Sequence, residues 1–554
     1  MPYFAQVLAK GNGINLQKKN HGKVVVMQFS YNKWFWVLMC FAAILLFFRI
    51  GAAPIYILDE AKNAQCAREM WLAGDWLVPT FNHSLRTDKP ALHYWFMGLS
   101  YGLFGEGAAQ ARLFSAMLGL GVIWLTYWQV RRYAGEARAF FTTVVLALSP
   151  HFLFEFRLSV PDPYLIFFTT AGLFSGFSYL NSGSRKALLV CAMLLGIAVL
   201  AKGPVALALP GLTLFIYVLV AKKWQVFKDP YLLLALLLAL GIAFPWYYAV
   251  HLKTGGAFTR GFFLDHNLNR FSSEKEGHGG PFFITPIIVL VGLLPFSLLI
   301  INALRRKLNY WKDPLFKFAT IVVLVYVVFF SISSTKLPNY PMPCYPFAAI
   351  LAGYFLSDVF ERKQLLPQYN WWIWLILSLV LPVGAYFGIK AEPAVAHLGW
   401  VAFLLLPLAA GTIWAFITQK NAPAALKRLG MAWVIFAGIF LWVGYPLLYA
   451  ENPVTKMIPL ISGAKTTRIL YYKAYNPGFN FNLPANQMII DPVENMEALV
   501  DFGTRISDGA ANTDVFVISR LEFVNEFKGT HFKEIARQRD LFELPTTIIF
   551  KWEP

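Results

Sequence analysis

Charged residues are scarce in this sequence. They make up only 14% of its 554 residues, whereas 57% are hydrophobic and the mean hydropathy is +0.52. A soluble globular domain carries about 25% charged residues, so this composition excludes an ordinary soluble fold. We therefore expect a chain that lies mostly within a membrane.

Acidic residues are the rarer charged kind. Lys and Arg exceed Asp and Glu by 48 to 30, which gives a formal net charge of +18. These cations lie in short loops between apolar runs, whereas a nucleic-acid-binding protein gathers them on a soluble face. The pattern argues against nucleic acid as a partner and favours contacts with anionic membrane lipids.

Cysteine is rare as well, and the four cysteines are too far apart for a metal knuckle or a disulfide framework. A removable secretory signal is also lacking, because no short apolar stretch with a small-residue cleavage site follows the basic N-terminal residues. We expect residues 1–32 to form a cytoplasmic tail and the first span, from about Trp34 to Ile50, to stay as an anchor.

Long apolar runs recur up to about residue 450, each with roughly the 20 residues that cross a hydrocarbon core of about 30 Å. Fourteen can be counted, but the segment Ala91 to Gly105 is short and aromatic, as is typical of an interfacial helix. With thirteen spans and a cytoplasmic N-terminus, the basic loops all fall inside. Residues 51–111, 157–163, 251–281 and 333–341 then lie outside, together with the C-terminus.

Hydrophobicity falls after about Tyr449. Short β-branched and aromatic runs such as DVFVIS and TTIIFKW follow, separated by an acid-bearing helical stretch near residues 493–502. We therefore expect an all-α membrane domain over residues 33–449 and a small α/β domain over residues 450–554.

Two acidic positions occur on the expected outer side, where a carboxylate is costly unless it is used. Asp59 is followed by Glu60 at the end of the first span, and Asp162 lies between two prolines. Each acid could instead cap a helix. Two acids in two outer loops favour a site, and Asp59, Asp162 and Glu60 are the candidate catalytic residues.

Cations on the outer side oppose the positive-inside tendency. Each alone could be a solvated or snorkelling charge. A cluster is typical of a phosphate site, because Arg and Lys form charge-assisted hydrogen bonds with phosphate oxygens. The candidates are Arg86, Lys89, Arg157, Lys202, Arg260, Arg270 and Lys336.

Five segments, in this order, carry a family resemblance: LDEAKNAQCAREMWLAGDWLVP, RTDKPALHYW, VPDPYL, LAKGP and STKLPNYPMPCYP. They resemble the aminoarabinose transferases that modify lipid A, which are multi-span glycosyltransferases related to the protein O-mannosyltransferases. The resemblance implies a GT-C fold in a bacterial inner membrane, with about thirteen transmembrane helices, two juxtamembrane helices in the first outer loop and a periplasmic C-terminal domain.

The resemblance also implies an activity. The donor would be undecaprenyl phosphate carrying 4-amino-4-deoxy-L-arabinose, the acceptor a phosphate of lipid A, and the outcome resistance to polymyxin. By motif, Asp59 and Asp162 match the family's acids and Lys89 and Lys202 its lysines, whereas the Arg270 match is less close. Lys336 and Tyr345, in the last segment, complete the expected substrate-binding residues.

A metal ion is left open by the sequence. No cofactor is required for the reaction, but Asp88 and His266 lie in two outer loops that could meet and are candidate ligands for zinc or another divalent ion. Interfacial histidine is the alternative, because no HxxE spacing supports a dedicated centre. Asp88 also departs from the family, whose members more often carry Glu before the KP pair.

The reaction breaks the bond between the anomeric carbon of the sugar and the carrier phosphate. Positive charge develops on the sugar and negative charge on the leaving phosphate, so carboxylates should face the sugar and cations should face the phosphate. Inversion is implied by the resemblance. One alternative is transfer of another sugar, such as mannose, to a hydroxyl on protein or polysaccharide, with Asp59 as general base. Another is a lipid or polysaccharide transporter, which would carry its charges mid-span.

The topology gives a first prediction. A reporter fused after Ala450 should be periplasmic, and a reporter placed after Gly105 should lie on the same side as one placed after Pro79, because residues 91–105 do not cross. Alkaline phosphatase activity of the fusions measures this. A cytoplasmic C-terminal reporter would contradict the placement of every outer loop.

Overall fold

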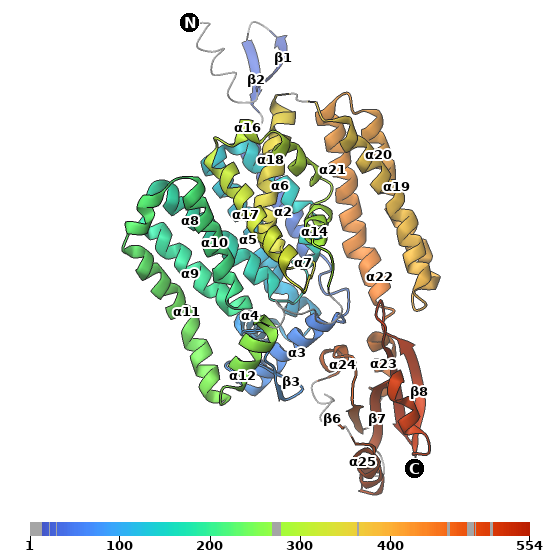
Figure 1. Cartoon of the computed structure of the whole chain (residues 1–554). Coiled ribbons are helices and arrows are strands. Elements are labelled where there is room, and N and C mark those ends of the chain that lie inside the picture. Colours follow the sequence, from blue (N-terminus) through green and yellow to red (C-terminus); the bar gives the residue numbers. More distant parts are fainter. Residues whose placement is uncertain are drawn as a thin grey trace.

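A computed structural model of the chain shows a helical bundle with a small sheet domain at one end (Figure 1). The residues that it describes are 14–20, 23–28, 30–268, 279–362, 365–462, 466–484, 492–493, 495–509 and 513–553. A short hairpin of β1 (Ile14–Asn20) and β2 (Lys23–Gln28) precedes the bundle.

Apolar helices form the bundle. Seven helical stretches are long and apolar enough to cross a membrane: Ala108–Ala134 (α5), Tyr231–Lys253 (α11), Pro314–Ile332 (α17), Met342–Glu361 (η3 and α18), Gln368–Ala391 (α19), Ala396–Ile417 (η4 and α20) and Ala422–Tyr449 (α21, η5 and α22). Two shorter apolar helices are Tyr31–Phe47 (α2) and Val205–Val220 (α10). The others are Glu136–Ala147 (α6), Pro150–Glu155 (α7), Asp162–Ser182 (α8), Arg185–Lys202 (α9), Ile284–Gly292 (α14) and Leu298–Arg305 (α15).

The number of helices in the bundle equals the number of spans that the positions of the basic loops predicted. When α6 is joined to α7 and α14 to α15, thirteen helical segments make up the bundle within the described ranges. The expected fold, a mostly helical multi-span membrane protein with a small C-terminal domain, is confirmed.

The loop after α2 contains two helices, as the resemblance implied. They are α3 (Leu58–Ala73) and α4 (Leu92–Phe104), with the short strands β3 (Thr80–Phe81) and β4 (Ser84–Leu85) between them. At 1.5 Å per residue, the 13 residues of α4 rise only about 20 Å. This helix is too short to span, and it packs against α3 and α5.

The C-terminal region is built on a five-stranded sheet of order β6-β5-β7-β9-β8. Its strands are β5 (Thr466–Tyr472), β6 (Pro492–Val493), β7 (Thr513–Arg520), β8 (Phe532–Arg539) and β9 (Thr546–Trp552). β5 runs parallel to β6 and β7, whereas β9 runs antiparallel to β7 and β8. The helices α23 (Pro453–Ile461), α24 (Gly478–Asn482) and α25 (Met496–Gly509) accompany the sheet.

Arg68 attaches this C-terminal region to α3. Its guanidinium donates hydrogen bonds to the carbonyl oxygens of Asn480, Phe481 and Leu483, at and just beyond the end of α24, and pairs with Glu106 at 2.8 Å. A helix end leaves its last carbonyl groups without partners within the helix, so Arg68 supplies the donors that α24 lacks. In Figure 1 the two helices lie at the same end of the bundle.

The second prediction tests this attachment. Arg68→Ala should destabilise the protein by about 3 kcal/mol, because it leaves several buried carbonyl groups and one carboxylate without their donor. Thermal unfolding in detergent and limited proteolysis near residues 466–484 measure the effect. The matched control is Arg505→Ala, which removes an exposed pair with Asp501 and should leave the midpoint unchanged.

Candidate active site

One cavity of about 150 Å³ lies where the loop between α2 and α5 meets the bundle. One part of its wall is polar and carries Asp88, Lys89, Lys202 and His266. The rest is largely apolar and aromatic, formed by Pro90, Leu165, Val205, Leu209, Phe262, Tyr326, Phe329, Phe330, Tyr340 and Pro343, with Ser333. The cavity therefore offers cations to an anionic group and apolar surface to a hydrocarbon group of the same ligand.

Lys202 and Asp162 form the closest charged pair at the cavity. Their atoms Nζ and Oδ1 are 2.5 Å apart, and the ammonium group also lies 4.9 Å from the ring centroid of Tyr340. Lys202 ends α9 because Gly203 takes a positive φ of 83° and a proline follows. Asp162 begins α8, where a carboxylate is favoured by the helix dipole.

Asp59 and Lys89 form a second, looser pair. Their atoms Oδ2 and Nζ are 4.0 Å apart, and the Asp59 side chain is 54% exposed while that of Lys89 is only 10% exposed. Asp59 lies in the first turn of α3. The structure therefore brings four of the expected residues together as two acid–lysine pairs, and the two lysines line the cavity.

Asp88 connects the loop after α2 with η2. Its carboxylate lies 3.3 Å from His266 Nε2 in η2 (Gly261–Leu268) and 3.5 Å from Arg86 Nε. Burial raises the pKa of Asp88, but Arg86, His266 and Lys89 outweigh this effect and hold the pKa below its usual value. The terminal nitrogens of Arg86 are buried without a hydrogen-bond partner among the described residues.

Asp88 and His266 do not by themselves make a metal centre. A catalytic zinc site has three protein ligands, and the described residues contain no group of three His, Cys, Asp or Glu side chains placed to hold a metal ion.

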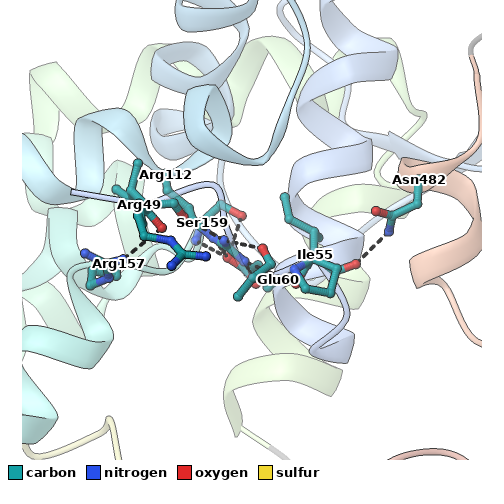
Figure 2. Close-up of polar contacts among 10 residues, drawn as sticks. Arg49, Ile55, Glu60, Arg112, Arg157, Ser159 and Asn482 are labelled. Carbon is teal, nitrogen blue, oxygen red and sulfur yellow. Dashed lines mark hydrogen bonds and ion pairs between the residues drawn. The ribbon is translucent and has the colours of Figure 1, made fainter. Parts of the chain in front are cut away.

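Glu60 has a different environment from Asp59. It is fully buried, and its two oxygens accept hydrogen bonds from Arg112 Nε and Nη2 at 2.7 and 2.8 Å. The backbone N–H of Ser159 donates to it as well, at 3.0 Å (Figure 2). Both oxygens are occupied within the protein, so we assign Glu60 to holding the site together and keep Asp59 and Asp162 as the candidate catalytic acids.

Several other expected residues do not line the cavity. Arg157 donates to carbonyl groups at the end of α2, including those of Leu45 and Arg49 (Figure 2). Lys336 donates to the carbonyl group of Ser333 at 2.7 Å, and the Tyr345 hydroxyl lies 2.8 Å from His151 Nδ1. Arg270 lies outside the described residues.

Sequence reasoning missed other residues at this site. Tyr340 and Phe262 line the cavity, and no spacing distinguishes them from the chain's many other aromatic residues. Glu155 is buried in α7 near the acid–lysine pairs. It could have been found, because an acid within the apolar run HFLFEF is unusual.

Comparison with known proteins relates the chain to sugar transferases. Residues 88–248 match the family described as dolichyl-phosphate-mannose-protein mannosyltransferase. An undecaprenyl phosphate-alpha-4-amino-4-deoxy-L-arabinose arabinosyl transferase from Pseudomonas paraeruginosa is 31% identical, with 69% of this chain and 71% of the relative covered. A protein of the same name from Enterobacter sp. is also 31% identical and covers 68% and 71%.

The fold is similar to that of a solved structure. The crystal structure of ArnT from Cupriavidus metallidurans bound to undecaprenyl phosphate aligns with a TM-score of 0.75, at 22% identity, over 94% of this chain and 98% of that one. At this identity the likeness concerns the fold alone.

The third prediction concerns the cavity lysines. Lys89→Ala and Lys202→Ala should each weaken binding of a long-chain prenyl phosphate by about 10- to 100-fold, because each removes a charge-assisted hydrogen bond in a buried place. Binding of the uncharged prenol should stay the same. Titration calorimetry in detergent measures both ligands, with the exposed Lys253→Ala as the control. Unchanged phosphate binding in both cavity variants would contradict this reading.

Proposed function

The chain belongs to the ArnT-like GT-C glycosyltransferases, and from this premise we propose that it transfers 4-amino-4-deoxy-L-arabinose from undecaprenyl phosphate to lipid A phosphate groups. The reaction takes place at the periplasmic face of a bacterial inner membrane and confers resistance to polymyxin and other cationic peptides. Proteins of this family are multi-pass membrane enzymes that use a polyprenyl phosphate sugar donor. The names of the two relatives support the particular sugar.

One observation carries the proposal. The cavity combines two lysines, each within 4.0 Å of an acid, with a largely apolar and aromatic wall. A polyprenyl phosphate likewise has a polar and an apolar part, because its phosphate is stabilised by cations and its hydrocarbon chain by apolar surface. The bond to be broken would then lie at the polar part of the cavity, beside Asp59 and Asp162.

In this mechanism the two lysines bind the donor phosphate and the two acids orient the sugar. Lys89 and Lys202 hold the donor phosphate and stabilise the negative charge that develops on it as it leaves. Asp59 and Asp162 face the sugar, where positive charge develops. An acceptor phosphate is ionised at neutral pH, so the reaction needs no strong general base. Direct attack from the opposite face inverts the anomeric carbon.

Arg86 is a further candidate for the acceptor or donor phosphate. Its guanidinium is buried, and its terminal nitrogens have no hydrogen-bond partner in the described part of the chain. A buried guanidinium with unused donors is costly unless a ligand accepts from it. Phosphate oxygens accept such hydrogen bonds in pairs.

The fourth prediction tests the activity through Asp59. Cells that lack the protein should show lipid A without the aminopentose by mass spectrometry, and the wild-type gene should restore it. Asp59→Asn keeps the size of the side chain but removes its charge. The purified variant should therefore be about 30- to 1,000-fold slower, which corresponds to about 2 to 4 kcal/mol of transition-state stabilisation.

The exposed acid Asp501 provides the control, because Asp501→Asn changes the same group in α25, within the C-terminal region. Its rate should equal that of the wild type. If lipid A is the same in cells with and without the protein while a glycoprotein or polysaccharide differs between them, the acceptor is a hydroxyl group instead. Near-normal turnover by Asp59→Asn would move the catalytic assignment to Asp162.

A further inference from the structure

The turn between β8 and β9, residues 540–545, has an apolar tip. Its residues Phe542 and Leu544 are 50% and 88% exposed, and no other large hydrophobic side chain of the described residues is as exposed as Leu544. Surface turns are usually built from Gly, Pro, Asn, Asp and Ser. Two large apolar side chains at the tip of a turn therefore indicate a binding surface.

The base of this turn is firmly held. Asp540 is fully buried and accepts hydrogen bonds from Arg520 Nη1 at 2.6 Å and from Thr547 Oγ1 at 2.5 Å. Phe542 has a positive φ of 60°, a conformation that is costly for a bulky residue. The fold thus holds the turn in one conformation, in which the apolar tip stays exposed.

The turn lies where the bundle ends and the sheet domain begins (Figure 1). The ring centroid of Phe542 is 6.3 Å from that of Tyr449, the last residue of α22. The backbone N–H of Leu541 donates to the hydroxyl group of Tyr56, in the loop after α2, at 2.8 Å. Because the stretch Ala422–Tyr449 is long and apolar enough to cross a membrane, the tip lies beside the point at which a span leaves the hydrocarbon core.

Exposed apolar side chains are also present on the helices that end near the turn. Leu447 in α22 is 38% exposed, and Phe48, directly after α2, is 54% exposed. The Phe48 ring contacts Trp442 of η5 edge to face, with 5.2 Å between the centroids. Apolar side chains on spanning helices face lipid, and Trp and Tyr gather at the level of the headgroups. The tip of the turn therefore continues a surface that is already suited to lipid.

We infer that the β8–β9 turn enters the lipid surface and places Phe542 and Leu544 at the boundary between headgroups and acyl chains. Both side chains gain free energy when they leave water. Glu543, which separates them, is less exposed than either, so the acid does not form the tip. Lipid then holds the sheet domain at the membrane, in addition to the contact between Arg68 and the end of α24.

The fifth prediction tests this contact with a fluorescent label. Leu544→Cys is labelled with nitrobenzoxadiazole in a Cys40→Ser background, because the other three cysteines are buried. The full chain is placed in nanodiscs of phosphatidylethanolamine and phosphatidylglycerol, with or without a lipid that carries a doxyl quencher near its headgroup. Interfacial segments reach about 5 to 10 Å into this region, so the quencher should remove about half of the emission or more.

The matched control is Lys528→Cys in the same background. Lys528 is exposed and precedes β8, whereas the turn follows that strand. The 8 residues of β8 separate its two ends by about 23 Å. A label at this position should keep its emission in both kinds of nanodisc.

A second pair of variants tests the turn's own side chain. Phe542→Asp places a charge at the tip, and Asp adopts a positive φ more readily than Phe does, so the turn should keep its conformation. Quenching of the label at position 544 should then fall severalfold. Ile535→Asp, which changes another exposed apolar residue of β8, 38% exposed, should leave the quenching unchanged.

Three other results would overturn the inference. Emission at position 544 that ignores the quencher, as at position 528, would mean that the tip stays in water. A shift of the emission to shorter wavelength without quenching would mean that protein, such as a second copy of the chain, covers the tip. Quenching that is unchanged by Phe542→Asp would mean that the label enters lipid by itself. No sugar transfer is measured, so the result is independent of the proposed function.

Discussion

The buried ion pair between Glu60 and Arg112 is the interaction on which the site's geometry depends. Arg112, from α5, also donates to the carbonyl oxygens of Ile50 and Ala53, beyond the end of α2. Glu60 accepts from the backbone N–H of Ser159, three residues before Asp162. A single pair thus fixes the start of α3, which carries Asp59, against the backbone at Ser159, just before Asp162. Breaking such a pair leaves an uncompensated buried charge, which costs about 3 to 5 kcal/mol.

The charges nearer the cavity serve a different purpose. Lys202 and Lys89 are each held by an acid, so neither lysine is an isolated charge in a low-dielectric place. A phosphate that binds must therefore share these lysines with Asp162 and Asp59. In the proposed function, the same contact would place the two acids beside the sugar attached to that phosphate, so one arrangement would both bind the carrier and orient the sugar.

Much of the fold could be predicted from the sequence, because the membrane makes apolar length and loop charge decisive. The candidate site was predicted less completely. Asp59 and Glu60 are neighbours, but successive residues on a helix point about 100° apart. Only the structure therefore shows that Asp59 lies beside Lys89, whereas Glu60 pairs with Arg112. Arg157 was expected to bind phosphate, but it donates to carbonyl groups at the end of α2. These partners are more than a hundred residues away in the sequence, so no local pattern indicates the contact.

The contact between Arg68 and the end of α24 joins residues 412 to 415 positions apart. The donors are therefore synthesised long before their acceptors. These hydrogen bonds can form only after translation has passed Leu483, so the environment of Arg68 in α3 is completed by the C-terminal region.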